Sequence, residues 1–286
     1  MTQAFAYSYN VIGFQGEDVA QSIDRLARLG YDAVEVEGEP ERQDPKRIRK
    51  LVDDAGLTVG SVCPNFTAGR DISHPDPEVR RTALAYLRGV AEFAAELGAP
   101  LFIVAPTAYA RVEPIAEPGD EWLWAVEGVR VAGEHAASLG VDLTLECWNR
   151  YGTYLLNRLE EGARFWSETG LSNGGIMADT FHMNIEERSI PDSILAFGNL
   201  LNHVHLSDSN RLAPGLGHID FAEVLHALHE VGYGGRLAFE LITSLPNLLD
   251  GRPDSPTLHD VAGQAISHMK EVERRLVEGP VETRPS

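Results

Sequence analysis

The chain has 286 residues, and 43% of them are hydrophobic, which is enough for a substantial core and excludes a disordered chain. Acidic residues outnumber basic residues by 43 to 24, so the formal net charge is −19. This charge repels nucleic-acid phosphates and anionic lipids. We therefore expect neither a nucleic-acid partner nor a role at a membrane surface.

The sequence predicts a cytoplasmic protein. The first residues lack a basic start followed by an apolar run, which is the pattern of a secretory signal. No stretch approaches the ~18 uninterrupted apolar residues of a transmembrane helix. The two cysteines, Cys63 and Cys147, fall in predicted buried strands, and such thiols are typical of a reducing compartment.

Predicted strands and helices alternate along the chain. Apolar runs rich in Val, Ile, Leu and Phe predict eight strands, at residues 5–12, 31–39, 57–62, 100–106, 141–148, 174–179, 202–206 and 236–242. Apolar residues at helical spacing predict helices at residues 17–29, 45–55, 76–98, 121–139, 160–168, 221–231 and 259–276. Gly30 can end the first helix, and Asp76 with Pro77 can begin the third.

Eight strand–helix units at a spacing of roughly 36 residues predict a (β/α)8 barrel. A doubly wound open sheet is the competing fold, but no G-x-G-x-x-G motif follows the first strand. No Pro/Ser-rich linker divides the chain. We therefore predict a single barrel domain over residues 1–278 and a flexible polar tail over residues 279–286.

Four predicted strands in the second half of the chain each end in a potential metal ligand. Glu146 follows the fifth apolar run and Asp179 the sixth, while His205 and Glu240 end the seventh and eighth. In a barrel, these ends are neighbours on one face. Three carboxylates and one imidazole suit Mn²⁺ or Mg²⁺, with Co²⁺ possible, better than a structural zinc ion. Taken singly, each carboxylate could mark the exposed end of a strand, and His205 could be a core histidine. Spacing alone therefore leaves open whether these residues form a metal site or have only structural roles.

Long motifs surround these ligands and carry a family resemblance. The segments ECWNRYGTYLLN, DTFHMNIEE and HLSDSNRLAPGLGHID resemble the D-tagatose/D-psicose 3-epimerase family, which belongs to the xylose-isomerase-like sugar isomerase barrels. The match covers the last four predicted strands. The resemblance implies that Glu146, Asp179, His205 and Glu240 bind one divalent ion, with Mn²⁺ expected and Co²⁺ or Mg²⁺ as alternatives.

The resemblance also implies a mechanism. A metal that binds two oxygens of a hydroxy-ketone acidifies the adjacent C–H, and removal of that proton leaves an enediolate held by the metal. The resemblance assigns the proton transfer to Glu146 and Glu240, on opposite sides of the substrate, so that the product is an epimer. His182 and Arg211 match family residues that hold substrate oxygens. Trp148, two residues after Glu146, is predicted to lie close to the substrate.

One position departs from the family pattern. The family has a glutamate six residues after the first metal-binding glutamate, where it contacts the sugar, and this chain has Gly152. Glycine supplies no hydrogen bond to the substrate. We interpret the change as a different or enlarged substrate pocket, or as a different fate of the same enediolate.

Several functions remain open at this point. The leading hypothesis is a metal-dependent ketose 3-epimerase, or a related isomerase, acting on a keto-sugar or sugar conjugate. One alternative is a C-glycoside deglycosidase catalytic subunit, which would eliminate an aglycone from a 3-oxo-C-glycoside and work with a small partner subunit. A keto-inositol dehydratase is another. Zinc endonucleases share the architecture, but the net charge of −19 opposes DNA binding. The resemblance further implies a homodimer or homotetramer.

Overall fold

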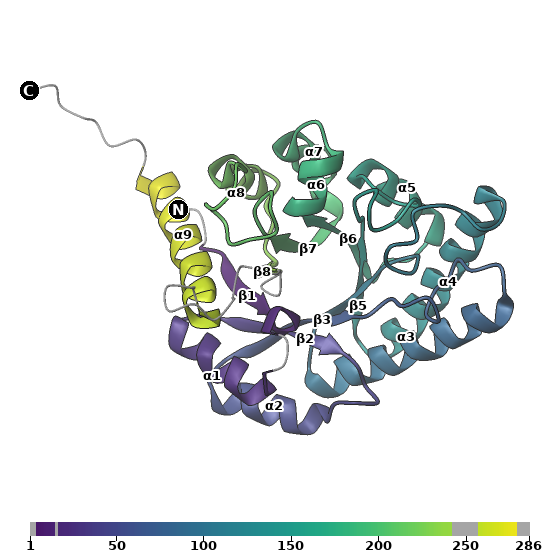
Figure 1. The fold of residues 1–286 in the computed structure, drawn as a ribbon, viewed down its shortest axis with the longest axis horizontal. Helices are drawn as coiled ribbons and strands as arrows, with labels where there is room; N and C mark the ends of the chain where they lie inside the picture. The colour runs from purple at the N-terminus through teal and green to yellow at the C-terminus, as the bar shows by residue number, and fades with distance from the viewer. Residues whose placement is uncertain (1–3, 15–16, 242–256, 279–286) are drawn as a thin grey trace, which may run out of the picture.

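The computed structural model describes residues 4–14, 17–241 and 257–278, and its strands form a closed parallel barrel (Figure 1). Each strand pairs with the next along the chain, and the eighth pairs with the first. This confirms the predicted fold class. The strands are β1 (Ala6–Asn10), β2 (Ala33–Gly38), β3 (Thr58–Pro64), β4 (Leu101–Val104), β5 (Asp142–Glu146), β6 (Gly174–Asp179), β7 (Leu201–Leu206) and β8 (Arg236–Phe239).

Helices lie around the outside of the barrel (Figure 1). Helices alternate with strands along the chain, and all the strands point the same way. The loops that lead from a strand to the next helix therefore all lie at one end of the barrel. The α-helices are α1 (Val19–Leu29), α2 (Pro45–Asp54), α3 (Pro77–Leu97), α4 (Pro118–Ser138), α5 (Leu159–Thr169), α6 (Thr180–Glu186), α7 (Ile190–Phe197), α8 (Phe221–Glu230) and α9 (Leu258–Glu278). Two short 3-10 helices are η1 (Val11–Phe14) and η2 (Gly198–Leu200).

The predicted elements differ from the structure in three places. The first strand ends at Asn10, and the next four residues form η1 instead of extending the strand. Helices α6 and α7 lie between β6 and β7, where no helix was predicted. Helix α4 begins at Pro118, three residues earlier than predicted, because proline suits the first turn of a helix. The start of α3 is as predicted, since Asp76 accepts a hydrogen bond from Glu78 N at 2.9 Å.

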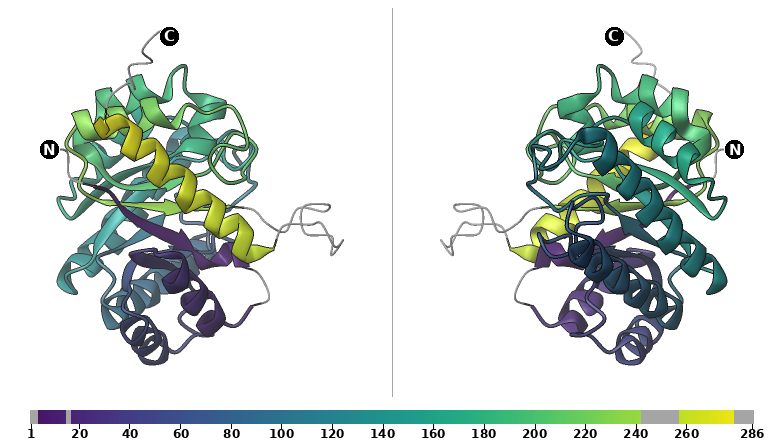
Figure 2. Two further views of the ribbon diagram at one scale, coloured as in Figure 1. Left: turned by 90° about the vertical axis from the view of Figure 1, so that its left-hand side faces the viewer. Right: turned by 90° about the vertical axis from the view of Figure 1, so that its right-hand side faces the viewer.

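The last helix closes the ring around the barrel. Helix α9 packs against both α8 and α1, and Figure 2 shows it running along the outside of the first strand. Glu273 of α9 accepts hydrogen bonds from Phe5 N at 2.8 Å and from the hydroxyl of Tyr7 at 3.2 Å, which ties β1 to this helix. The predicted tail, residues 279–286, lies outside the described residues, as does residue 242 of the predicted eighth strand. Within the described ranges, no helix combines the length and the apolar character needed to cross a bilayer.

A buried ion-pair cluster fixes the loops that follow β3, β4 and β5. Arg111 lies 2.7 Å from Asp71 through its Nε and also pairs with Glu121, and both carboxylates are fully buried. Burial would raise the pKa of Glu121, but hydrogen bonds from Tyr154 and Arg111 lower it. The backbone next to Arg111 pairs with the loop after β5, at Thr153. The cluster therefore holds these three loops together.

Replacing Arg111 by methionine is expected to lower the free energy of unfolding by about 3–5 kcal/mol, because it leaves two buried carboxylates without their cation. Chemical denaturation measures this change. Arg130→Met is the matched control, since Arg130 pairs with Glu127 and Glu134 on the exposed surface of α4. The control should lose no more than about 1 kcal/mol. Equal losses in the two variants would contradict the structural role of the cluster.

Candidate active site

The ends of strands β5 to β8 bring four potential metal ligands together. Glu146 and Asp179 are the last residues of β5 and β6. His205 is the next-to-last residue of β7, and Glu240 directly follows β8. One ligand atom from each side chain lies within 4.8 Å of those of the other three. The structure thus joins the four side chains that the sequence singles out, and their role as metal ligands stays a prediction.

The charges in this cluster favour a divalent cation. Arg211 donates to both carboxylate oxygens of Asp179, at 2.8 and 2.6 Å, and also to Glu240. Burial would raise the pKa of Asp179, but Arg211 lowers it well below its usual range. At Glu146, burial and the charge of Glu240 raise the pKa to about 8. The raised pKa of Glu146 reflects the crowding of carboxylates at this point, and an oxygen-rich set of donors that includes one imidazole fits Mn²⁺, Mg²⁺ or Co²⁺.

A carboxylate inside the barrel orients His205. Glu35, in β2, is fully buried, and its carboxylate lies 2.9 Å from His205 Nε2, 2.7 Å from His203 Nε2 and 2.5 Å from Ser61 Oγ. Burial would raise the pKa of Glu35, but the two imidazoles lower it, so the group is ionised and can only accept hydrogen bonds. Nε2 of His205 therefore carries a proton. Its Nδ1 faces Glu240, at 2.9 Å, and is the nitrogen available to a cation.

Replacing Glu35 by glutamine is expected to weaken divalent-metal binding by about 10–100-fold, although Glu35 does not itself face the cluster of four. The amide can donate as well as accept, so it no longer fixes the proton on Nε2 of His205. Titration calorimetry with Mn²⁺ measures the affinity. Glu37→Gln, two residues further along β2, is the control and should bind as tightly as the wild type. Unchanged binding by Glu35→Gln would show that Glu35 does not position the ligand.

His182 presents one N–H donor to the cluster. It lies in α6, whose first turn is capped by Asp179 through a hydrogen bond from Phe181 N at 2.8 Å. The backbone N–H of Asn149 donates to Nδ1 of His182 at 3.1 Å, so the proton of the neutral ring is on Nε2. Burial lowers the pKa of His182 to about 4. Its Nε2 lies 3.8 Å from Glu146 and 3.9 Å from Asp179.

The loop after β7 positions Arg211. This residue has a left-handed backbone, with φ at 62°, and its N–H donates to the carbonyl of Asp208 at 2.8 Å. The carboxylate of Asp208 in turn accepts from the backbone N–H groups of Gly215 and Ile219, at 2.8 and 3.1 Å. The Arg211 guanidinium also lies 4.9 Å from the centre of the Phe181 ring. Arg211 is therefore held over the cluster by a loop that has its own internal hydrogen bonds.

A cavity of about 360 Å³ opens onto two of the cluster carboxylates. Trp148 forms part of its wall, as predicted, and packs edge-on against Phe66 at 6.0 Å and against Tyr109 at 5.3 Å. His182 and Arg211 also line it. The full lining consists of Ile12, Cys63, Pro64, Asn65, Phe66, Tyr109, Glu146, Trp148, Phe181, His182, Arg211 and Glu240.

Gly152 lies against Trp148 and does not line this cavity. A Cβ atom at position 152 would be 3.1 Å from Cβ and 3.5 Å from Cγ of Trp148. The interpretation of Gly152 as a change in the substrate pocket stays a prediction, and the contacts show that position 152 would act on the pocket through Trp148. The departure from the family is a glycine that packs beside a tryptophan, and the tryptophan ring shapes the wall.

Sequence analysis missed three residues that act on the site. Glu35 and His203 orient His205 from inside the barrel, and Asn149 sets the tautomer of His182. The signal for Glu35 was present, because a glutamate in a strand covered on both sides must point into the core or into a site. The position of Tyr109 in the cavity wall had no comparable signal.

The barrel and its acidic cluster define a class of enzyme, the xylose-isomerase-like barrels. A family model described as "Xylose isomerase-like TIM barrel" matches residues 23–272.

Similar sequences and a similar solved structure identify the family within this class. The D-psicose 3-epimerase of Ruminiclostridium cellulolyticum is 33% identical over 232 residues, which are 78% of this chain and 78% of the relative. The 3-dehydro-D-guloside 4-epimerase of Escherichia coli is 28% identical over 235 residues, which are 79% of this chain and 88% of the relative. A crystal structure of D-psicose 3-epimerase with D-tagatose, from Clostridium cellulolyticum, has a TM-score of 0.85 at 27% identity and covers 93% of this chain and 99% of its own. The chain belongs to the D-tagatose/D-psicose 3-epimerase family, and it is an enzyme of the epimerase and isomerase type.

Proposed function

We propose that this enzyme inverts the carbon next to the carbonyl group of a keto-sugar, in the manner of a ketose 3-epimerase, with Mn²⁺ as its cation. The observation that carries the proposal is the convergence of Glu146, Asp179, His205 and Glu240 beside a cavity that Glu146 and Glu240 line. Glu146 and Glu240 come from β5 and from the end of β8, so they approach that space from different strands.

The four convergent side chains would hold the cation. A divalent ion bound there polarises the substrate carbonyl and acidifies the adjacent C–H. Glu35 supports binding by keeping the lone pair of His205 Nδ1 toward the other three ligands.

Glu146 and Glu240 can share the proton transfer, one as the base and the other as the acid. Burial would raise the pKa of Glu240, but Arg211 and His205 lower it, so Glu240 is ionised and suited to accept a proton. Glu146 lines the same cavity from the end of β5, so it can hold and return the proton. One carboxylate removes the proton from C3 on one face, and the other returns a proton on the opposite face. The roles reverse in the back reaction.

His182 and Arg211 orient the substrate. His182 offers its Nε2–H, and Arg211 offers its guanidinium to the oxygen on which negative charge develops as the proton leaves. Trp148 and Phe66 supply apolar surface for the sugar ring.

The relatives support epimerisation over elimination, since they include a D-psicose 3-epimerase and a 3-dehydro-D-guloside 4-epimerase. The test is incubation with D-fructose, D-tagatose and D-ribulose in Mn²⁺, followed by chromatography of the products. A C3 epimer from at least one ketose is expected. Release of an aglycone from a 3-oxo-C-glycoside, with no epimer from any ketose, would contradict the proposal in favour of the deglycosidase.

A further inference from the structure

A second cavity lies beside the catalytic one on the same face of the barrel. It has a volume of about 340 Å³ and is formed over the ends of β1, β2 and β3. Ile12 and Asn65 line both cavities, so the two cavities lie side by side. Each cavity lies near the lower end of the range of small-molecule sites, about 300–1,000 Å³, which suits one sugar-sized group.

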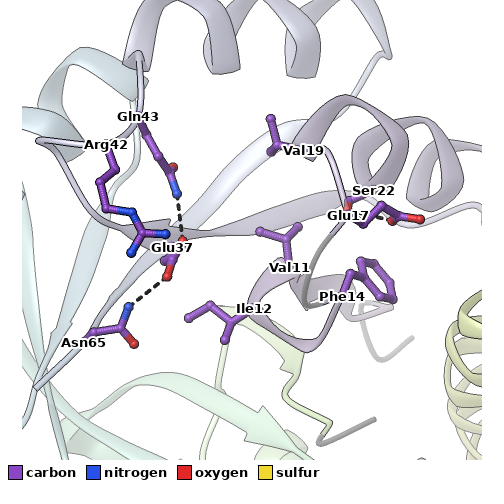
Figure 3. Close-up of a pocket in the computed structure, with 10 residues that line it drawn as sticks. All are labelled: Val11, Ile12, Phe14, Glu17, Val19, Ser22, Glu37, Arg42, Gln43 and Asn65. Atoms are coloured by element: carbon purple, nitrogen blue, oxygen red, sulfur yellow. Dashed lines mark hydrogen bonds between the residues drawn. The ribbon is translucent and has the colours of Figure 1, made fainter. Parts of the chain in front are cut away.

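The second cavity has a polar wall and a mainly apolar one. In Figure 3, Glu37, Arg42, Gln43 and Asn65 lie on one side, and Val11, Ile12, Phe14 and Val19 lie toward the other. Glu17 and Ser22 also lie on that second side, where Ser22 donates a hydrogen bond to Glu17. A sugar ring presents the same two kinds of surface, with hydroxyl groups at its edge and C–H groups on its faces.

The polar wall is built to accept hydrogen bonds from hydroxyl groups. The carboxylate of Glu37 accepts from Gln43 Nε2 at 3.0 Å and from Asn65 Nδ2 at 2.9 Å, which holds it in one orientation with lone pairs to spare. Gln43 lines the cavity and, through its Nε2, holds the Glu37 carboxylate in place for a ligand hydroxyl. Arg42 lies beside Glu37 in the same wall, so the wall carries both signs of charge and suits a neutral polar ligand.

We infer that the second cavity binds a neutral glycosyl group attached to the keto-sugar, so that the preferred substrate is a glycosylated keto-sugar and not a free ketose. The inference rests on the proposed function, because it places the reacting keto-sugar in the catalytic cavity. The E. coli relative is named for a dehydro-guloside, which is a keto-sugar carrying a further group.

The test compares D-fructose with two glucosyl-fructoses, maltulose (linked at O4) and isomaltulose (linked at O6). Mass spectrometry follows deuterium uptake at C3 in ²H₂O with Mn²⁺. At least one disaccharide should exceed D-fructose in kcat/KM by about 10-fold or more, since several hydrogen bonds are gained. Equal or lower values for both disaccharides would overturn the inference while leaving the proposed function intact.

Variants of residues that line the second cavity test whether the preference for a disaccharide arises there. Gln43→Ala removes the amide that orients the Glu37 carboxylate, and Val19→Phe adds bulk on the apolar side of the cavity. Both should reduce kcat/KM for the preferred disaccharide by about 10-fold and leave D-fructose within about twofold. Glu41→Ala is the control, because Glu41 is exposed and does not line the cavity. If the two variants affect D-fructose and the disaccharide equally, the cavity is no glycosyl site.

A direct binding measurement separates this inference from the proposed function. If no sugar exchanges its C3 proton, the proposed function fails, and titration calorimetry with isomaltulose and maltulose still tests the cavity. Wild-type protein should then bind a disaccharide more tightly than D-fructose, and Val19→Phe should abolish the difference. Identical binding by wild type and Val19→Phe would overturn the inference.

Discussion

Glu240→Gln is expected to slow C3 proton exchange by about 10²–10⁴-fold, even when Mn²⁺ is saturating. Glutamine keeps the shape of the side chain and one oxygen, but it cannot accept a proton from carbon. Glu240 is the more exposed of the two proposed acid–base groups, with 24% of its side chain accessible, and Arg211 and His205 lower its pKa despite burial. It is therefore the group that is ionised and in reach of substrate.

Deuterium uptake at C3 is measured by mass spectrometry at increasing Mn²⁺ concentrations until the rate is constant. Glu223→Gln is the control, because Glu223 is exposed in the first turn of α8, and it should exchange at the wild-type rate. A Glu240→Gln enzyme that keeps more than about a tenth of the wild-type rate at saturating metal would remove Glu240 from proton transfer.

Asp179→Asn is expected to weaken metal binding by about 100-fold or more, since loss of a direct ligand should exceed the 10–100-fold effect of residues that act behind the ligands. Asparagine remains a good helix cap, so the start of α6 and the position of His182 should be kept. Both proton-transfer carboxylates also stay in place. High Mn²⁺ should therefore restore much of the exchange rate in Asp179→Asn, whereas it should not in Glu240→Gln.

Thermal unfolding provides a readout of this metal effect that does not depend on activity. Mn²⁺ at 100 times its dissociation constant should stabilise the wild type by about 2.7 kcal/mol, because only the folded protein holds the four ligands together. At the same concentration, Asp179→Asn should gain less than about 0.5 kcal/mol. Equal stabilisation of both proteins would place the metal elsewhere.

The sequence predicted the barrel because the strands of a parallel barrel are buried on both faces and appear as apolar runs. The differences between the predicted and the observed elements have local causes. Asp179 ends β6 and also caps α6. The segment DTFHMNIEE was interpreted only as a family motif, and the helix within it was not predicted. Val11–Phe14 continues the apolar character of β1, and only the backbone turn into η1 distinguishes it from strand.

For the site, the four ligand positions could be predicted because strand ends of a barrel converge by topology. Residues that act on them from other strands could not be found this way. Glu35 lies 170 residues before His205, and a buried glutamate in a strand does not by itself show which side chain it contacts. The second cavity depends on side chains from η1, α1, β2 and the loops after β2 and β3, so it becomes visible only in three dimensions.

The most direct test of the central claim is deuterium incorporation into a keto-sugar recovered from ²H₂O, with metal-stripped protein and with the same protein after Mn²⁺ is added. We predict deuterium at C3 alone, only after Mn²⁺ is added, and in both the starting sugar and its epimer. Deuterium uptake that is equally fast in metal-stripped protein, or no uptake from any keto-sugar with Mn²⁺ bound, would contradict the account.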